Sequence, residues 1–231
     1  MPRARSRNQE PRQTTAAYEN GSGCFSGYLL PPLAVLLIAC LLTAFALQTA
    51  PMHISALPLN TLPPSSGISP IFTREVQYWG SDILRWAGAS SLDPNLVAVI
   101  MQIESCGDPR ARSSAGAMGL FQVMPFHFHT GENPYNPETN ALRGLNYLWR
   151  SLQAAFGDSR LALAGYNGGI GVIARGEWTW SAQTKRYVLY GAPMYEEARA
   201  GFSQSKSLDE WYSKYGAGLC RQAAQRLGLN Q

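Results

Sequence analysis

Apolar residues recur at helical spacing through most of the chain after residue 72. The segment around residues 76–87 carries apolar side chains three and four positions apart, which predicts an amphipathic helix ended by Gly88 and a serine turn. A more apolar helix should begin at Pro94, because Asp93 can cap it and proline is tolerated at the first helical position. No run alternates with the period of two that is typical of a strand. The pattern therefore predicts a mainly α domain over residues 72–231.

Capping residues and glycines predict where the later helices begin and end. Asn136 and Pro137 should open a long helix that stops at Gly157. A shorter helix should run from Ser159 to about Asn167, where two glycines follow. Further helices are expected near residues 183–190, 208–215 and 219–227.

An uncharged apolar run from Leu29 to Leu47 stands apart from this helical domain. Its length is close to the ~20 residues that cross a bilayer. Arginines precede the run and none follows closely, which favours a cytoplasmic amino terminus and export of the rest. We therefore expect a basic cytoplasmic segment (residues 1–28), a transmembrane anchor (29–48) and a single-pass protein of the bacterial cell membrane with an extracytoplasmic domain.

Two alternatives remain open for the apolar run. A signal peptide cut after Ala46 would release the domain as a secreted protein, and the residues before Cys40 loosely resemble a lipoprotein signal. Residues 49–71, rich in proline, serine and threonine, lack a sustained period and predict an extended linker to the domain.

Composition and charge narrow the function. The chain has 231 residues, of which 45% are hydrophobic, and a net charge of +4, which suits one sizeable globular domain. Four of the 19 basic and two of the 15 acidic residues precede the apolar run, so 15 basic and 13 acidic residues follow it. A nearly neutral domain offers no electrostatic surface for nucleic acid.

The four cysteines divide at the apolar run. Cys106 and Cys220 belong to the exported part, where two cysteines in an oxidising compartment favour a disulfide, although two separately buried thiols remain an alternative. The three histidines do not complete a metal site with them. We expect no metal and no cofactor.

Glu104 stands at the end of the apolar helix predicted from Pro94. It shares a helix face with Leu96 and Ile100, so its carboxyl lies on the stripe that should be buried. Desolvation raises the pKa of a carboxyl toward the range where it can donate a proton near neutrality. The alternative is a helix-end glutamate that reaches water. The nearest acid, Asp108, precedes a proline and suits a turn rather than a catalytic pair.

Three blocks of sequence bear on this choice. They are Glu104-Ser105, the run AGAMGLFQVMP at 115–125 with Ser113 ahead of it, and ALAGYNGG at 162–169. In this order they resemble the catalytic domain of lytic transglycosylases of the soluble-lytic-transglycosylase (SLT) type, which are related in fold to goose-type lysozymes. The resemblance covers about residues 74–200 and implies a lysozyme-like helical fold.

The resemblance also implies a substrate and a set of site residues. The substrate would be peptidoglycan glycan strands, cleaved between N-acetylmuramic acid and N-acetylglucosamine with closure of a 1,6-anhydro ring. Glu104 matches the single general acid, which then acts as the base. A site with one carboxylate suits assistance by the acetamido group of the sugar. Positions that match substrate-contacting residues are Ser113, Met118, Gln122, Tyr166, Asn167 and Tyr187.

Purely structural roles for some of these residues, and two other functions, remain as alternatives. Ser113 and Gln122 can serve as loop hydrogen-bonding residues, and Tyr187 can be a core aromatic. A hydrolytic muramidase and a non-catalytic glycan-binding module are the competing functions, although a binding module gains nothing from a poorly solvated acid. Among the tryptophans we expect Trp79, Trp86 and Trp149 in the core, and Trp178 and Trp180 as surfaces for sugar stacking.

Overall fold

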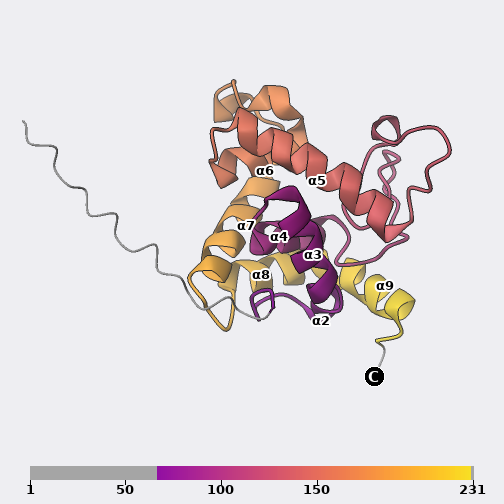
Figure 1. Ribbon diagram of the computed structural model, residues 1–231. Coiled ribbons are helices and arrows are strands. Elements are labelled where there is room, and N and C mark those ends of the chain that lie inside the picture. The colour runs from indigo at the N-terminus through magenta and orange to yellow at the C-terminus, as the bar shows by residue number, and fades with distance from the viewer. Residues whose placement is uncertain (1–66, 230–231) are drawn as a thin grey trace, which may run out of the picture. The chain divides into compact units, whose positions relative to one another are not determined.

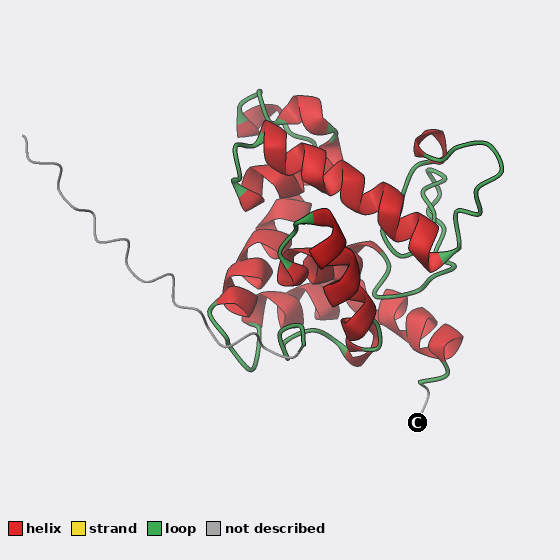
Figure 2. Cartoon of the chain, in the orientation of Figure 1, coloured by secondary structure: helices red, strands yellow, loops and turns green. Residues whose placement is uncertain are grey.

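The computed structural model describes residues 67–229, which fall within one compact unit. This part consists of helices and loops, and it contains no strand (Figure 2). No helix among these residues is long and apolar enough to cross a membrane. The predicted anchor at residues 29–48 and most of the predicted linker lie outside the described residues.

The helices follow one another along the chain with short turns between some of them (Figure 1). They are α2 (Arg74–Gln77), α3 (Gly80–Ser90), α4 (Pro94–Glu104), α5 (Pro137–Ala154), α6 (Ser159–Gly168), α7 (Ala182–Arg199), α8 (Lys206–Trp211) and α9 (Ala217–Leu227). The 3-10 turns are η1 (Pro125–His127), η2 (Ile170–Val172) and η3 (Glu177–Thr179), and η4 (Tyr212–Gly216) is a π-helical turn.

Helix α4 is the centre of the core (Figure 1). All of residues 96–102 are buried, which is expected of a helix apolar on every side. The carboxylate of Asp93 caps it by accepting a hydrogen bond from the Asn95 amide at 2.8 Å, as predicted. The second carboxylate oxygen of Asp93 accepts from the Tyr195 hydroxyl at 3.0 Å, which ties α7 to the start of α4. Because α4 ends at Glu104, this residue lies where the chain leaves the core.

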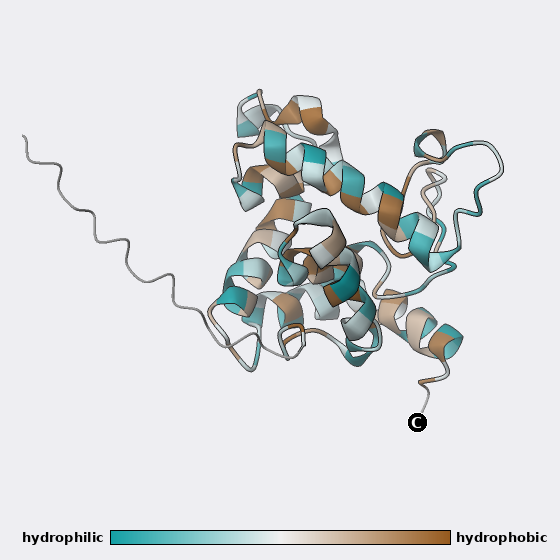
Figure 3. Ribbon diagram, viewed as in Figure 1, coloured by the Kyte–Doolittle hydropathy of each residue, from teal (hydrophilic) through white to brown (hydrophobic). Residues whose placement is uncertain are grey.

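Helix α7 packs against α4, and α6 packs against both α5 and α7. The caps of α5, α6 and α7 are Asn136, Asp158 and Ser181, whose side-chain oxygens each accept a hydrogen bond from a first-turn amide. Figure 3 shows hydrophobic and hydrophilic residues interspersed along α5, as expected of an amphipathic helix. Helix α6 ends in Gly168 with Gly169 at φ +89°, as the paired glycines predicted.

Two predicted helix boundaries are wrong. The first predicted helix is divided into α2 and α3, because the Tyr78-Trp79 turn directs the Trp79 indole into the core, where it donates to the Gly107 carbonyl at 2.9 Å. Helix α7 continues to Arg199 rather than ending near residue 190, and it includes Pro193. Because Pro193 and Leu189 are both exposed, water can satisfy the Leu189 carbonyl that this proline leaves unbonded.

A disulfide joins Cys106 to Cys220, which confirms the predicted pairing. It ties the residue two positions after Glu104 to helix α9. The Gln102 side-chain amide donates to the Cys106 sulfur at 3.1 Å, and its oxygen accepts from the Thr73 amide, also at 3.1 Å. The end of α4, the start of α2 and α9 are therefore joined around one buried polar cluster.

Candidate active site

Glu104 lies at the exit of α4, partly exposed, and lines a hollow of about 200 Å³. We call this the acid hollow. The rest of its lining comes from the end of α6, from α7 and from the carboxyl-terminal segment. The residues are Ile103, Asn167, Gln183, Arg186, Tyr187, Tyr190, Trp211, Tyr215 and Leu219. Glu104 is the only carboxylic acid among these lining residues.

The surroundings of Glu104 favour its protonated form. Burial raises the pKa of its carboxyl to about 8, and the nearby Tyr187 hydroxyl lowers that pKa by a smaller amount. Burial also raises the pKa of the Tyr166 and Tyr187 phenols well above 10, and the Glu104 charge raises both further. At neutral pH the site therefore holds a carboxylic acid with a proton to donate, beside two neutral phenols.

Tyr187 stands beside this acid. Its hydroxyl oxygen is buried and has no hydrogen bond of normal geometry with any described residue. Because this hydroxyl nevertheless shifts the pKa of Glu104, it lies close to the carboxyl without the geometry of a normal hydrogen bond. A buried hydroxyl without a partner is costly, so a hydrogen-bonding group bound beside Glu104 would stabilise Tyr187.

A second hollow of about 280 Å³ adjoins the first, because Asn167 lines both. Gln122, Phe126, Tyr147 and Tyr166 are among its lining residues, and we call it the aromatic hollow. The Tyr147 and Tyr166 rings meet edge to face with centroids 5.7 Å apart. The amide oxygen of Asn167 accepts from the Thr184 hydroxyl at 3.1 Å, which fixes Asn167 between the two hollows.

The loop that carries Gln122 is positioned from helix α5. Asn140 is buried there, and its amide oxygen accepts from the Phe121 amide at 2.9 Å while its nitrogen donates to the Met118 carbonyl at 2.8 Å. The Tyr166 hydroxyl donates to the Phe121 carbonyl at 2.7 Å. Gly144 permits this approach, since a Cβ there would lie 2.6 Å from the Phe121 Cβ.

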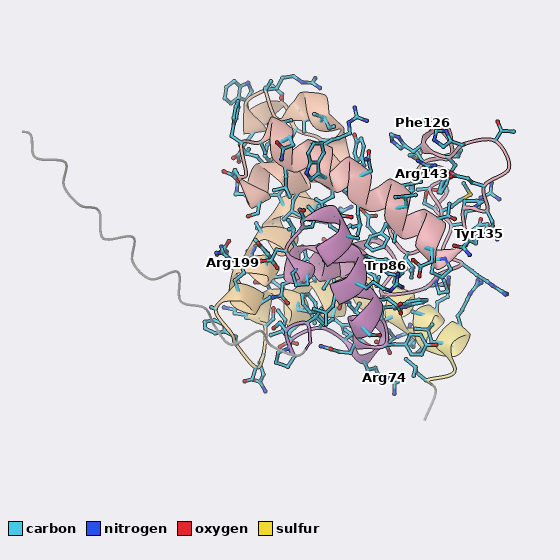
Figure 4. The ribbon with its side chains drawn as sticks, in the orientation of Figure 1. Arg74, Trp86, Phe126, Tyr135, Arg143 and Arg199 are labelled. Carbon is cyan, nitrogen blue, oxygen red and sulfur yellow. A yellow bond between two sulfur atoms is a disulfide. The ribbon has the colours of Figure 1, made fainter. Side chains whose placement is uncertain are left out.

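The outer part of the same loop is also attached to α5. Arg143 donates through Nε to Glu132 at 2.9 Å. Figure 4 shows Arg143 projecting from α5 on the side of the molecule where Phe126 lies, on η1. At the inner end of the loop, the Ser105 hydroxyl donates to the Leu120 carbonyl at 2.6 Å, so Ser105 supports the end of α4.

The structure brings together most of the predicted site residues. Glu104, Asn167 and Tyr187 line the acid hollow, and Gln122 and Tyr166 line the aromatic hollow. Gln122 has φ +45°, an uncommon conformation for a residue other than glycine, and its amide donates to the Gly119 carbonyl at 3.0 Å.

Ser113 and Met118 line neither hollow. The Ser113 hydroxyl accepts from the Ala117 amide at 3.0 Å, which is the loop role that the sequence left open. Met118 pairs through its backbone with Val123, with both hydrogen bonds 3.0 Å long. Their predicted contacts with substrate stay predictions. Asp108, as expected, makes a turn: its carboxylate accepts from the Arg110 amide at 2.8 Å.

Two expectations about tryptophans are wrong. Trp180 is buried, because its indole donates to the Val172 carbonyl at 3.1 Å, so it offers no sugar surface. Trp149 is 43% exposed instead of lying in the core. Trp79 and Trp86 are buried as expected, and Trp178 is exposed but lines neither hollow.

One cluster of potential metal ligands occurs among the described residues. It consists of Glu75, Cys106 and Cys220. Since both sulfurs belong to the disulfide, neither offers the thiolate that binds a metal.

Sequence reasoning missed the wall of the acid hollow that α7 and the carboxyl-terminal segment supply. Gln183, Arg186 and Tyr190 are three and four positions apart and share one face of α7. That spacing was a readable signal. The Tyr215 and Leu219 contributions depend on how η4 and α9 pack, which no local pattern reveals.

The fold and the site together define a helical domain with one protonated carboxylic acid in a cleft made of two adjoining hollows. Comparison with known proteins shows what this domain is similar to. Residues 82–188 match the model of the transglycosylase SLT domain, so this part of the helical domain is similar to that family.

Two known proteins illustrate the similarity. A protein named transglycosylase, from Enterobacteria phage PRD1, is 40% identical over 116 residues, which are 46% of this chain and 42% of that protein. The chain thus matches less than half the length of this relative. The solved structure of an inactive mutant of the lytic transglycosylase Slt from Pseudomonas aeruginosa is 21% identical, covering 65% of this chain and 24% of that one, with a TM-score of 0.39.

Proposed function

We propose that this chain is a peptidoglycan lytic transglycosylase that cleaves the β-1,4 bond between N-acetylmuramic acid and N-acetylglucosamine. The observation that carries the proposal is the carboxyl of Glu104, whose pKa burial raises to about 8, within a domain similar to the transglycosylase SLT family. An acid with this pKa is protonated at neutral pH and can protonate the oxygen of a leaving sugar.

The chemistry of the lining residues supports a mechanism with one carboxylate. Glycosidases that use two carboxylates place the second about 5–9.5 Å from the first. Glu104, however, is the only acid among the residues that line the two adjoining hollows. With no carboxylate to form a covalent intermediate or to activate water, the acetamido oxygen of the muramoyl residue stabilises the developing positive charge at C1.

Glu104 completes the proposed reaction. After it protonates the glycosidic oxygen, the C1–O bond breaks and Glu104 becomes a carboxylate. That carboxylate then removes the proton from the 6-hydroxyl of the same muramoyl residue, whose oxygen bonds to C1. The product is a 1,6-anhydro ring, and Glu104 regains its proton without consuming water. Tyr187, Tyr166 and Asn167 orient the sugar around it.

We further propose that residues 29–48 anchor the chain in the bacterial cell membrane, with the domain outside the cytoplasm. The length of the apolar run and the arginines before it support this proposal. A cleaved signal would instead release the same domain as a secreted enzyme.

Muropeptide masses test the reaction. Purified sacculi are incubated with the full chain or with its Glu104→Gln variant, and the soluble products are weighed by mass spectrometry. We expect products lighter than hydrolytic ones by one water, and a loss of about 100- to 10,000-fold in rate for the variant. Reducing-end products would instead identify a hydrolytic muramidase. Binding without products from either protein would identify a glycan-binding module.

A further inference from the structure

A positively charged side chain lines the acid hollow together with Glu104. Arg186 is the only cationic residue in that lining, and it makes no ion pair with a carboxylate among the described residues. It precedes Tyr187, which lowers the pKa of the acid. The groups that shift the pKa of Glu104 are its burial and Tyr187, so this cation leaves the acid protonated.

The guanidinium of Arg186 is held in place by an aromatic ring. Its central carbon lies 4.9 Å from the centroid of the Tyr215 ring. Stacking of this kind orients the planar guanidinium and leaves its edge free to make two parallel hydrogen bonds. Tyr215 in turn contacts Tyr190 edge to face, with centroids 5.8 Å apart, so the two tyrosines and Arg186 form one continuous surface.

The fold builds this surface with an uncommon element. Tyr215 lies in the π-helical turn η4, and such turns occur frequently at functional sites. Gly216 makes the turn possible, because a Cβ there would lie 2.3 Å from the buried Trp211 ring. The other nearby cation, Lys214, is paired with Glu210 at 2.5 Å, so Arg186 supplies the available positive charge.

The surface lies largely outside the matched family region. The match ends at residue 188, whereas Tyr190, Trp211, Tyr215 and Leu219 complete the acid hollow. Most of this wall therefore belongs to a part of the chain that the family model does not match.

We propose that Arg186, stacked on Tyr215, binds a carboxylate of the glycan substrate beside the bond that Glu104 breaks. A planar guanidinium suits a carboxylate, because both groups can form two parallel hydrogen bonds. This inference rests on the proposed function, which makes the ligand a muramoyl glycan. Two carboxylates of such a glycan share the required chemistry: the lactyl carboxylate of a muramoyl residue without peptide, and a carboxylate of an attached stem peptide.

Equilibrium binding to the full chain tests the proposal. All proteins carry Glu104→Gln, so that no ligand is consumed, and are compared with and without Arg186→Gln. The probes are a GlcNAc–MurNAc tetrasaccharide with free lactyl carboxylates, the same tetrasaccharide with these carboxyls converted to primary amides, and a tetrasaccharide with stem tripeptides. Arg221→Gln, which removes an exposed arginine from a different hollow, is the matched control.

We expect Arg186→Gln to weaken binding of at least one carboxylate-bearing probe about tenfold, as for a charged hydrogen-bonded pair near the surface. The amidated probe should bind the two proteins equally, and Arg221→Gln should change neither affinity. Arg186→Lys should restore only part of the loss, since lysine keeps the charge but not the planar fork. The probe that is affected identifies the source of the carboxylate, lactyl or peptide.

Equal affinities of the Arg186→Gln and parent proteins for every probe would overturn the proposal, as would an equal loss for charged and amidated tetrasaccharides. These outcomes are separate from the test of the reaction. If sacculi yield no anhydro products while carboxylate binding still depends on Arg186, the proposed reaction fails and the carboxylate site remains.

Discussion

At the scale of single residues, Glu104 places an ionisable carboxyl in surroundings that oppose its charge. Its pKa rises from 4.5 to about 8 on folding because burial disfavours the carboxylate. Between these two pH values the folded chain binds more protons at this residue than the unfolded chain does. By linkage, the free energy of unfolding falls as pH rises through this window. The acid that suits catalysis is therefore a cost to stability at alkaline pH.

Replacing Glu104 with glutamine should remove this cost. At pH 4 the carboxyl is protonated in the folded chain and mostly protonated in the unfolded chain, so the variant and parent should differ least. At pH 9 we expect the variant to gain about 1–4 kcal/mol relative to the parent, less than the full shift implies because Glu104 is partly exposed. Thermal unfolding at both pH values measures this difference. A melting-temperature difference that does not change with pH would contradict the raised pKa.

Glu104 should set the alkaline limit of activity, and Tyr187 should shift that limit through the pKa of Glu104. Glu104 must be protonated to act as the acid, so kcat/KM should fall as pH rises through about 8. The Tyr187 hydroxyl lowers the pKa of Glu104, and Tyr187→Phe should therefore move this limb to higher pH. A pH-rate profile on solubilised glycan strands checks both statements. Ionisation of Tyr166 should not affect the pH-rate profile near pH 8, because its phenol stays neutral far above that pH. An unchanged pH-rate profile in Tyr187→Phe would show that Tyr187 does not influence the pKa of Glu104.

The residue scale also shows where sequence reasoning succeeds. Glu104 could be singled out because a carboxylate on an apolar helix face is rare, and Gln122, Tyr166 and Asn167 because they stand in recognisable blocks. Trp180 could not be placed, since the contact that directs its indole inward, the hydrogen bond to the Val172 carbonyl, depends on how the turns after α6 fold. Composition alone cannot say on which side of a turn an indole lies.

At the scale of elements, close contact between α5 and the loop at residues 119–122 shapes the cleft. Gly144→Ala would put a methyl group 2.6 Å from the Phe121 Cβ and 3.2 Å from the Tyr166 hydroxyl. We expect a loss of about 1–3 kcal/mol of stability from overpacking, together with lower kcat/KM because the aromatic hollow is displaced.

Gly88→Ala is the matched control for this prediction. It also adds a methyl group inside a helix, but nothing lies within 4 Å of the new atom. Alanine should therefore stabilise α3 by about 0.5–1 kcal/mol. Unfolding curves and activity of the two variants distinguish a local clash from a general effect of the substitution; equal behaviour would show that Gly144 is not needed for packing.

The disulfide is the second contact between elements that bears on the site. It joins the end of α4 to α9 across a sequence separation of 114 residues, and Leu219, next to Cys220, lines the acid hollow. Removing both cysteines by Cys106→Ser and Cys220→Ser should lower stability by about 2–5 kcal/mol. Differential scanning calorimetry with and without dithiothreitol measures the effect. The reductant should lower the melting temperature of the parent and not that of the double variant.

Helix positions could be predicted where a local signal defines them, and not where tertiary contacts do. Asp93, Asn136 and the glycines after α6 marked helix ends correctly because capping is a short-range interaction. The extent of α7 was underestimated, since an exposed proline at 193 is compatible with a helix whose freed carbonyl faces water. The wall formed by η4 and α9 required knowledge of how distant segments pack.

At the scale of the whole molecule, the disulfide connects the fold to the compartment. Such a bond persists in oxidising compartments and is rare in the cytoplasm. Its presence between Cys106 and Cys220 is therefore consistent with the proposed export of the domain by residues 29–48. Cys24 and Cys40 would remain on the cytoplasmic side or within the membrane.

This relation makes the oxidation state of the cysteines a reporter of topology. In cells, the full chain should carry Cys106 and Cys220 as a disulfide, and it should sediment with membranes after an alkaline wash. Leu36→Arg combined with Leu41→Arg should abolish both properties, because each arginine costs about 2.5–3.5 kcal/mol near the centre of a membrane helix. The variant would stay in the cytoplasm with free thiols. Acid quenching, alkylation and intact-mass measurement count the free thiols, and the intact mass also shows whether the chain is cut after Ala46.

The Cys106→Ser and Cys220→Ser double variant is the control, because any free thiols counted in it come from Cys24 and Cys40. A cleaved signal would give an oxidised domain that no longer sediments with membranes. That result would support export of the domain and rule out the membrane anchor. If Cys106 and Cys220 were oxidised in the Leu36→Arg, Leu41→Arg variant, the disulfide would form without export, and it could not serve as a reporter of topology. Reduced cysteines in the unmodified chain would place the domain in the cytoplasm, away from the glycan that Glu104 is proposed to cleave.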